Sequence, residues 1–498
     1  MPYTILLLAL AVTGYFITLA IYRIYFHALS EYPGPKLWIA TRLMFVQSML
    51  RGNNIRDVAA IHKKYGDVVR IAPNELSYAK TQAWDDIFGY RPGHREFPRN
   101  PVWWTSPPGQ PSSFTTANDV DHPRMRKVLS HAFSDKALRD MEPTLQKYTR
   151  LLISRLRETI SRDGEDKNVV NIVDWYRFTM FDIIRDLLFN EPFDCLSNCQ
   201  FHWWIQGVSN AFKINAFLGC IRFFPGLESL LYKFMPQSLL DIQRRHYQAV
   251  IDKTQKRIAE GTERPDIMSY LIRNNDSQGM TMSEIESSMN VLSIGGSHNT
   301  ASTLSGITNY LTKNSTCLQR LNAEIRSTYK TDEDITLANL SGLPYLNAVI
   351  NEGLRMAPPF PAGLPRCVPE GGDTICGEFI PGGVNSWALQ RVSSAFALPD
   401  DFIPERWLDA KDLDPESAEI FANDEHEAVQ QFSVGPRACL GKQFAYAEMR
   451  LVLASIVLNF DIEKVNSPRG RVQWENQKTY MVVEEEPFDV RLIPYNAV

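Results

Sequence analysis

A single cysteine near the C-terminal end of the chain, Cys439, lies among two glycines, a proline and an arginine in the stretch FSVGPRACLG. The apolar spacing that follows, LGKQFAYAEMRLVLASIVL, predicts an amphipathic helix that begins just beyond this cysteine. Free backbone N–H groups and the positive end of the helix dipole favour a thiolate at such a position. A thiolate binds transition metals. A lone cysteine is also typical of an inert buried thiol, so the surrounding residues must decide between the two.

The spacing around Cys439 resembles the haem-binding loop of the cytochromes P450, which reads F-x-x-G-x-R-x-C-x-G. The match holds at five positions in ten, namely Phe432, Gly435, Arg437, Cys439 and Gly441. This resemblance implies that Cys439 is the thiolate ligand of the iron in haem b (iron protoporphyrin IX). It also implies that Phe432 shields the sulfur and that Arg437 reaches a haem propionate.

Three further side chains match positions at which this family holds the haem propionates. The stretch DHPRMRKVLSHAFS is similar to the family's third helix and places His122 and Arg126 four residues apart. In APPFPAGLPR, Arg366 matches another propionate partner, and Pro358–Leu364 resembles a substrate-facing loop. Carboxylates are bound well by cationic donors. The alternative for His122 and Arg126 is a solvated basic helix start.

A Glu-x-x-Arg pair, Glu352 and Arg355, lies on one face of a predicted helix. Alone, this pattern is typical of a solvated surface pair. The stretch PERW follows, and its Arg406 stands where the family has a third partner, so the three residues resemble the family's buried Glu-Arg-Arg network. We expect a structural role, in which loss of one member destabilises the fold by about 3–5 kcal/mol.

The segment GGSHNT, which begins at Gly295, departs from the family pattern of a small residue, glycine, an acid and two threonines. Gly295 and Gly296 fit, because glycines weaken a helix by about 1 kcal/mol each but leave room for a diatomic ligand. His298 stands at the acid position and Asn299 at the first threonine position, so only Thr300 matches the remainder.

This departure changes the proton chemistry expected of the site, since the acid–alcohol pair organises proton delivery during dioxygen activation. A histidine can pass a proton near neutral pH, whereas an asparagine can hold a water molecule but cannot ionise. Thr300 is rotated by roughly 100° on the helix from the threonine position. Three outcomes stay open: a relay through His298 and water with Asn299 and Thr300 beside it, a redox-neutral isomerase or dehydratase, or a non-catalytic haem-binding relic.

The elements that position these residues are mainly helices. Apolar residues recur at 3.6-residue spacing over most windows from Pro123 to about Pro359. Short extended segments are predicted as a hairpin at Val68–Ala72 and Leu76–Ala79, and again around Thr374–Val384 and Tyr480–Ile493. The pattern predicts a mostly α protein with a minor β region, and the resemblance implies the cytochrome P450 fold in a single large domain.

Composition and charge exclude several other classes of protein. The chain has 498 residues, 44% of them hydrophobic, and a net charge of -5 without a basic block, which gives no reason to expect nucleic acid as a partner. Its seven cysteines are scattered and form neither a disulfide framework nor a paired C-x-x-C zinc motif. A reducing compartment suits such a chain.

The N-terminus has no charged side chain from Met1 to Tyr22. About 20 apolar residues span the ~30 Å hydrocarbon core of a bilayer as a helix, and the following basic residues favour a cytoplasmic body. A cleaved signal peptide is the alternative. We predict a membrane anchor at 1–26, a proline-rich hinge at 27–40, and a haem-thiolate catalytic domain at 41–498, held on the endoplasmic reticulum by a single membrane pass.

The resemblance implies a monooxygenase that hydroxylates or epoxidises an apolar small molecule with O2 and electrons from NADPH. The electrons are expected to come through an NADPH-cytochrome reductase, for which Arg124, Lys127 and Lys442 form a candidate footprint. Across several segments the chain resembles fungal microsomal enzymes of secondary metabolism, and this resemblance favours a terpenoid or polyketide substrate. The redox-neutral enzyme and the relic remain the alternatives.

Three segments each have two alternative interpretations. The aromatic-rich stretches 97–116 and 201–235 either pack as loops and core or line a pocket or the membrane surface. Gly382–Arg391 is a few residues shorter than the family usually has. Either the sheet edge is trimmed there, or the sequence derives from an imperfect gene model.

Overall fold

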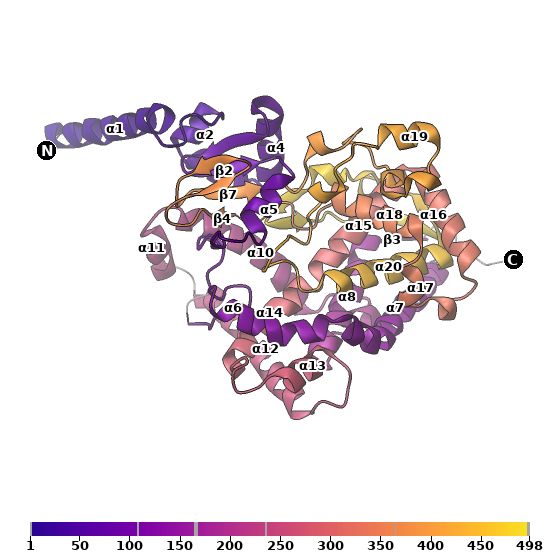
Figure 1. The fold of residues 1–498 in the computed structure, drawn as a ribbon. Helices are drawn as coiled ribbons and strands as arrows, with labels where there is room; N and C mark the ends of the chain where they lie inside the picture. The colour runs from indigo at the N-terminus through magenta and orange to yellow at the C-terminus, as the bar shows by residue number, and fades with distance from the viewer. Residues whose placement is uncertain (1, 107–108, 164–167, 235–236, 364, 496–498) are drawn as a thin grey trace.

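The computed structural model describes residues 2–106, 109–163, 168–234, 237–363 and 365–495. The body is mainly helical with small sheets, as predicted (Figure 1). The longer helices are α1 (Pro2–Tyr25), α4 (Asn54–Tyr65), α6 (Asp121–Ser130), α7 (Asp135–Asp163), α8 (Ile172–Phe189), α10 (Trp203–Arg222), α12 (Gln237–Ala259), α14 (Met282–Gly295), α15 (His298–Lys313), α16 (Ser315–Thr328), α18 (Pro344–Met356) and α20 (Lys442–Asn459). The shorter ones are α2 (Lys36–Ala40), α3 (Leu43–Leu50), α5 (Gln82–Phe88), α9 (Cys195–Asn198), α11 (Leu227–Phe234), α13 (Ile267–Asn274), α17 (Leu337–Leu340) and α19 (Pro415–Ile420).

The strands form four small sheets in the described part of the chain. The largest has the order β1-β2-β7-β4, and its β1–β2 hairpin lies where the sequence predicts one. A second sheet has the order β3-β11-β8, and two further hairpins are β5–β6 and β9–β10. The strands are β1 (Val68–Ala72), β2 (Glu75–Tyr78), β3 (Val169–Asn171), β4 (Arg366–Cys367), β5 (Asp373–Ile375), β6 (Glu378–Ile380), β7 (Asn385–Ala388), β8 (Phe460–Lys464), β9 (Lys478–Tyr480), β10 (Val482–Glu484) and β11 (Asp489–Pro494).

The shortened segment Gly382–Arg391 still supplies a strand. Its middle forms β7, which runs parallel to β2 on one side and antiparallel to β4 on the other. The segment therefore supplies an inner strand of the main sheet. Ser386, Trp387 and Ala388 of this strand are buried.

The interior is built where α15 crosses α8, α18 and α20, which gather in the lobe of Figure 1 away from the main sheet. Two glycines permit the close crossing of α15 and α18. A Cβ at Gly353 would lie 2.2 Å from Ile307, and one at Gly306 would lie 2.3 Å from the Cβ of Ala357. Such a distance is a clash, so only glycine allows these backbones to approach.

The predicted central helix is divided in two. The apolar spacing predicts one continuous helix, but α14 ends at Gly295 and α15 begins at His298. Gly296 and Ser297 between them leave regular helical geometry, and the Ser297 hydroxyl donates to the Ser293 carbonyl at 3.1 Å. Adjacent glycines and a serine that bonds back to the preceding turn are ordinary causes of such a break.

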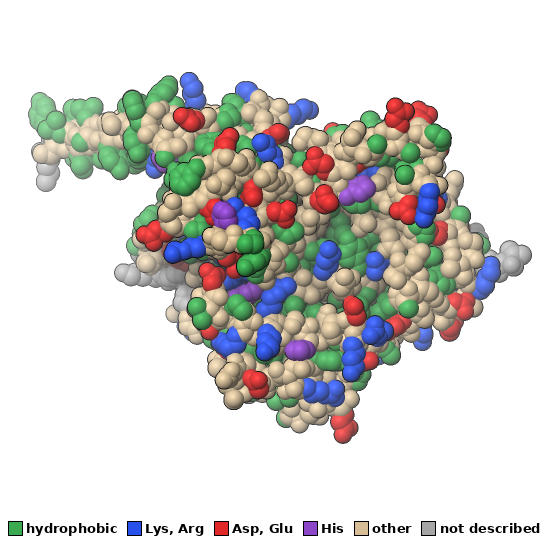
Figure 2. Space-filling view, viewed as in Figure 1, with side chains coloured by type: hydrophobic (Ala, Val, Ile, Leu, Met, Phe, Trp, Pro, Cys, Tyr) green, Lys and Arg blue, Asp and Glu red, His purple; other side chains and the backbone are tan. Residues whose placement is uncertain are grey.

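Helix α1 projects from the body and carries apolar side chains around its exposed surface (Figure 2). The span Tyr3–Tyr25 has a mean hydropathy of 2.3, and none of it is buried in the protein. It is long and apolar enough to cross a membrane, and a signal sequence would meet the same description. The helix is consistent with the predicted anchor.

The hinge region 27–40 is attached to the body rather than free. The buried Arg70 guanidinium donates to the carbonyls of Arg23 at 2.8 Å and Leu29 at 3.2 Å. A Cβ at Gly34 would lie 2.3 Å from the carbonyl oxygen of Arg70, so a glycine is needed there. The last residues of the region form α2 (Lys36–Ala40).

Candidate functional site

The cysteine loop is held in a tight turn directly ahead of α20. The Cys439 N–H donates to the carbonyl of Phe432 at 2.7 Å, which closes the loop. Gly435 has a φ of 75°, and a Cβ there would lie 2.0 Å from the carbonyl of Phe88. The motif therefore requires this glycine because of both its left-handed conformation and the close approach of another segment.

The Cys439 side chain is accessible, yet the protein around it raises the pKa of its thiol. Burial is the main cause, and the Gly441 N–H, Arg126 and Lys442 act in the opposite direction. The helix start thus acts in the predicted direction, but burial outweighs it. An accessible thiol that is still strongly desolvated borders a hollow inside the protein rather than its outer surface.

A cluster of arginines surrounds His122, the first predicted propionate partner. The His122 side chain is buried, and burial together with neighbouring positive charges lowers its pKa to about 3. The charges come from all three predicted arginines and from one that the sequence did not indicate: Arg437, Arg99, Arg126 and Arg366. The structure therefore brings the predicted propionate partners together.

Few carboxylates balance this cluster. Arg437 donates to Glu96 at 3.0 Å and to Asp119 at 2.7 Å, and Arg366 lies 3.6 Å from the same Glu96. Within the described part of the chain, the Arg126 guanidinium donates to the carbonyl of Ala438 at 2.7 Å and pairs with no carboxylate. Four cations thus share two carboxylates, and two positive charges are left over.

Arg99 is the member that sequence reasoning missed. Its Nη1 atom is buried and has no hydrogen-bond partner among the described residues. Burial and the neighbouring Arg366 and Arg437 hold its pKa well below the ordinary value. Its guanidinium lies 4.1 Å from the ring centroid of Trp104. The only signal in the sequence was an arginine between a proline and a run of aromatic residues. This arginine has no fixed spacing to the cysteine, so no motif identified it.

The donor set fits haem b. An excess of two positive charges and an unpartnered buried guanidinium suit a ligand with two carboxylates, which the haem propionates supply. The accessible thiol of Cys439 beside this cluster suits the iron. His122, Arg126, Arg366 and Arg437 therefore lie close together beside the cysteine loop. Within the loop, the ring of Phe432 lies 5.4 Å from that of Tyr446.

The predicted Glu-Arg-Arg network is buried as expected. Arg355 donates to both oxygens of Glu352, at 2.7 and 2.8 Å, and Arg406 donates to Glu352 at 3.3 Å. Arg406 also pairs with Asp424, and the Trp407 indole N–H donates to Glu352 at 2.9 Å. These bonds tie α18 to the segment that precedes the cysteine loop, so their role is structural.

The glycine and the asparagine of the central segment lie on either side of the break between α14 and α15. Gly295 is exposed to open space, since a Cβ there would meet nothing within 4 Å, and Asn299 lies four residues further on. The Asn299 amide oxygen is buried without a hydrogen-bond partner in the described structure. Thr300 points elsewhere: its hydroxyl donates to Glu448 of α20 at 3.1 Å, and burial raises the pKa of Glu448 well above its usual value. Thr300 is therefore not a substitute for the missing threonine.

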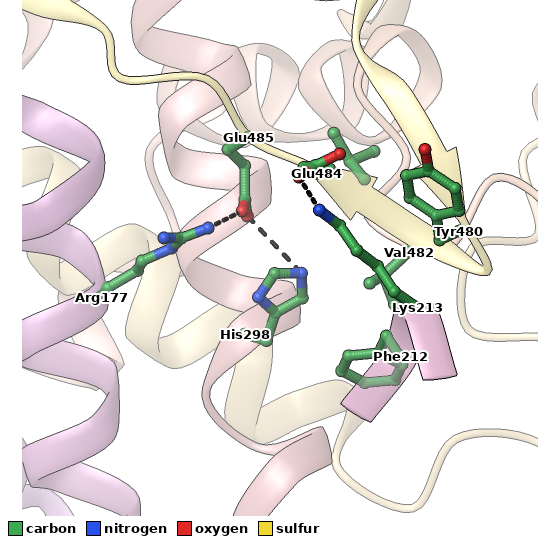
Figure 3. Close-up of a pocket in the computed structure, with 9 residues that line it drawn as sticks. Arg177, Phe212, Lys213, His298, Tyr480, Val482, Glu484 and Glu485 are labelled. Carbon is green, nitrogen blue, oxygen red and sulfur yellow. Dashed lines mark hydrogen bonds and ion pairs between the residues drawn. The ribbon is translucent and has the colours of Figure 1, made fainter. Parts of the chain in front are cut away.

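His298 faces a separate cavity of about 140 Å³, where its ring nitrogen Nε2 lies 3.7 Å from Glu485 (Figure 3). Arg177 of α8 pairs with the same carboxylate. Burial lowers the pKa of His298, and Glu485 beside it works in the opposite direction. Neither Arg177 nor Glu485 was a candidate from the sequence.

The two aromatic stretches contact each other. The ring of Trp103 lies 5.9 Å from that of Phe223, and a Cβ at Gly219 would lie 2.4 Å from Trp103. These side chains pack with Phe45 into a small core, which favours the packing interpretation for them. The side chains of Trp203, Trp204 and Phe234, and residue Leu364 of the predicted substrate loop, lie outside the described residues.

The chain is similar to known proteins over almost its whole length. A family model described as "Cytochrome P450" matches residues 32–491. Cytochrome P450 monooxygenase astJ of Aspergillus oryzae is 39% identical over 481 residues, which are 96% of this chain and 94% of the relative. Cytochrome P450 monooxygenase efuB of Hormonema carpetanum is 37% identical, with 96% and 94% covered. Cytochrome P450 monooxygenase astA of Talaromyces wortmannii is 38% identical, with 98% and 96% covered.

Proposed function

Because the chain belongs to the cytochrome P450 family, we propose that it inserts one atom of O2 into an apolar small molecule of fungal secondary metabolism. The family and the mostly α cytochrome P450 fold predicted from the sequence are confirmed. The chain is a haem-thiolate monooxygenase, and haem b is its cofactor. The substrate, the electron donor and the residue roles below are proposals.

The observation that carries the proposal is the arginine cluster beside Cys439. Its two uncompensated positive charges, the unpartnered Nη1 of Arg99 and the accessible thiol form one binding site for a metal porphyrin with two carboxylates. In the proposed roles, Cys439 ligates the iron, and His122, Arg126, Arg366 and Arg437 join Arg99 in holding the propionates.

Bound haem supplies the activation of dioxygen, and the residues of this chain position the reactants. Gly295 leaves room on the helix, and the Asn299 amide can donate a hydrogen bond or hold a water molecule there. The His298 imidazole can accept a proton and release it, although burial lowers its pKa. We expect apolar side chains around the substrate to exclude bulk water.

Electrons are expected to come from NADPH through an NADPH-cytochrome reductase. Of the three cations in the candidate footprint, Arg124 is already paired with Glu284 at 2.7 Å and with Asp121 at 3.0 Å. Lys127 and Lys442 are therefore the more available cations for an acidic partner. Helix α1 supports a site on the endoplasmic reticulum membrane, with the catalytic domain in the cytoplasm.

A redox-neutral isomerase or dehydratase is the second candidate. The observation that favours it is the missing acid–alcohol pair: Asn299 replaces the first threonine, and Thr300 is bonded to Glu448 instead. Such an enzyme would need the thiolate-ligated haem but no protons for dioxygen activation.

The test is turnover of a candidate substrate by the purified full-length enzyme with and without NADPH and reductase. We select terpenoid and polyketide candidates by their ability to shift the iron spin state on binding. The proposal expects product only when electrons and O2 are both present, with one oxygen atom from labelled O2 in the product. Equal turnover without electrons would reject it in favour of the redox-neutral enzyme.

A further inference from the structure

Three buried side chains from distant parts of the sequence meet beside the central helix: Arg177, His298 and Glu485 (Figure 3). The side chain of Glu485 has an exposed fraction of 0%, and that of His298 has 4%. Glu485 holds Arg177 with one oxygen, Oε2, and turns the other, Oε1, toward His298 Nε2 at 3.7 Å. Both of these facing atoms are buried and make no hydrogen bond to described residues.

The cavity at this cluster reaches from the buried carboxylate to a less buried ion pair. Its other lining side chains include Phe212, Lys213 and Tyr480, and Lys213 pairs with Glu484, which neighbours Glu485 in sequence. The side chains of Lys213 and Glu484 are 43% and 37% exposed. A cavity of about 140 Å³ is large enough for water, since ~10–15 Å³ of such space holds one molecule.

The charges in the cluster favour an ionised Glu485 and a neutral His298. Burial alone would raise the pKa of Glu485, but His298 and Arg177 together hold it below its ordinary value. For His298, burial and Arg177 lower the pKa, while Glu485 and a hydrogen bond to the backbone of Val483 raise it. Glu485 is thus the nearby group that makes protonation of His298 easier.

We propose that Glu485 supplies the carboxylate that the central helix lacks, and that it acts as a positioning residue by stabilising the protonated form of His298. The family pattern places an acid at position 298, and this chain has histidine there. In its place, the acid comes from the segment after β10 and faces the same helix position across the cavity. This inference rests on the proposed monooxygenase function, which needs a proton supply.

The proton balance involves no covalent or redox step. Neutral His298 takes one proton from water in the cavity, and the positive imidazolium that results is held by the Glu485 carboxylate. The ring would then release that proton toward Asn299, the next residue on the helix, and return to its neutral form. Arg177 keeps Glu485 ionised throughout, so the carboxylate stabilises the charge without taking the proton itself.

The direct test measures the pKa of His298. The full-length enzyme is labelled with 13C-histidine and examined by NMR as its diamagnetic ferrous carbon monoxide complex, and the His298 signal is assigned by its loss in His298→Gln. In Glu485→Gln we expect this pKa to fall by about one pH unit or more, because an opposite charge within ~4–6 Å shifts a pKa by that amount. Glu485→Asp keeps the charge and should restore part of the shift.

Glu484→Gln is the matched control, because it removes a carboxylate from the neighbouring residue that pairs with Lys213. It should change the pKa of His298 by less than half as much as Glu485→Gln does. An unchanged or raised pKa in Glu485→Gln overturns the proposal. If Glu485→Gln fails to fold, Glu485→Met, which is uncharged and of similar length, replaces it in the same comparison, and an unchanged or raised pKa of His298 again overturns the proposal.

Catalysis supplies the second measurement. In Glu485→Gln, product formed per NADPH should fall about tenfold, less than the ~10²–10⁴-fold contributed by direct proton transfer, because Glu485 acts through His298. The optimum pH should move down. A shifted pKa without a change in product per NADPH would reject the relay but leave the monooxygenase intact. Failure of the monooxygenase proposal itself would be recognised separately, as electron-independent turnover by the wild type.

Discussion

The thiolate side and the His298 side of this site are built in different ways. On the thiolate side, Cys439, Arg437 and Phe432 come from one loop with fixed spacing, and Gly435 is required by the contact with Phe88. On the other side, the cavity at His298 joins residues that lie more than a hundred positions apart in sequence. The comparison teaches that the proposed iron ligand lies in a loop encoded by local spacing, whereas the proposed proton supply depends on the tertiary fold.

The largest expected effect is on the thiolate side. Cys439→Ser should abolish the long-wavelength Soret band of the reduced carbon monoxide complex and all monooxygenase activity, because a serine hydroxyl does not replace a thiolate as the iron ligand. Cys199→Ser is the control, since Cys199 is also exposed but lies at the end of α9. A thiolate-type band in folded Cys439→Ser would contradict the assignment of the ligand.

The next largest effect concerns the scaffold of that loop. Glu352→Gln leaves the guanidinium groups of Arg355 and Arg406 buried with too few acceptors, and should lower the free energy of unfolding by about 3–5 kcal/mol. Denaturant unfolding followed by circular dichroism measures it. Glu405→Gln, whose carboxylate pairs with the half-exposed Arg320, should lower it by less than about 1 kcal/mol. Equal losses would mean that the buried network has no special role.

Arg99 tests whether the arginine cluster holds the haem. Arg99→Gln removes a guanidinium whose Nη1 atom has no hydrogen-bond partner among the described residues. It should speed haem loss about tenfold or more, because a hydrogen bond to a charged group contributes about 1.5–3 kcal/mol. Transfer of haem to an excess of apomyoglobin measures the rate. Arg124→Gln is the control, because Arg124 already has two carboxylate partners. If both variants lose haem equally fast, Arg99 is not a propionate partner.

The two histidines should differ in their response to pH. Folding lowers the pKa of both His122 and His298 below 6.5, so the unfolded chain binds more protons and stability falls as the pH drops through about 6.5. For His122 this loss continues toward its folded pKa of about 3 in the haem-free protein. Haem propionates should raise the pKa of His122, but they leave His298 unaffected.

Thermal unfolding of the haem-free and haem-bound proteins at several pH values measures this difference. In the haem-free protein, His122→Gln should reduce the fall in stability that occurs as the pH is lowered. Once haem is bound, the substitution should have little influence on this fall. His298→Gln should flatten it by a smaller and equal amount in both forms. If His122→Gln changes the pH dependence of stability equally with and without haem, His122 is not a propionate partner.

The sequence predicted the parts of this molecule that depend on short-range spacing. The cysteine loop, the Glu352 network and the β1–β2 hairpin follow from motifs and periodicity, and each lies where it was expected. Arg99 could not be predicted, because its role depends on a backbone bridge to Arg366, more than two hundred residues away. Strands of two or three residues, such as β4, are too short to show an alternating pattern.

Glu485 shows why the rest was hidden. It is the middle one of three consecutive glutamates in the tail, a run that is typical of a solvated acidic surface. Alternation along an extended chain turns neighbouring side chains to opposite sides, so Glu484 meets the partly exposed Lys213 while Glu485 points inward to Arg177. Only the fold specifies which of the three carboxylates is buried.

The smallest expected effect is at Asn299, which directly follows His298 in the sequence. Asn299→Thr restores the hydroxyl of the family pattern four residues after Gly295. If His298 and water already deliver protons, the added hydroxyl should lower the fraction of electrons lost as hydrogen peroxide by about twofold or less, which corresponds to roughly 0.4 kcal/mol. Peroxide formed per NADPH in the reconstituted enzyme measures this.

Thr300→Val is the matched control, since the Thr300 hydroxyl bonds Glu448 and its removal should not influence the peroxide yield. A tenfold fall in peroxide for Asn299→Thr would instead mean that the natural relay is severely impaired, and that the carboxylate of Glu485 does not compensate for the missing acid–alcohol pair.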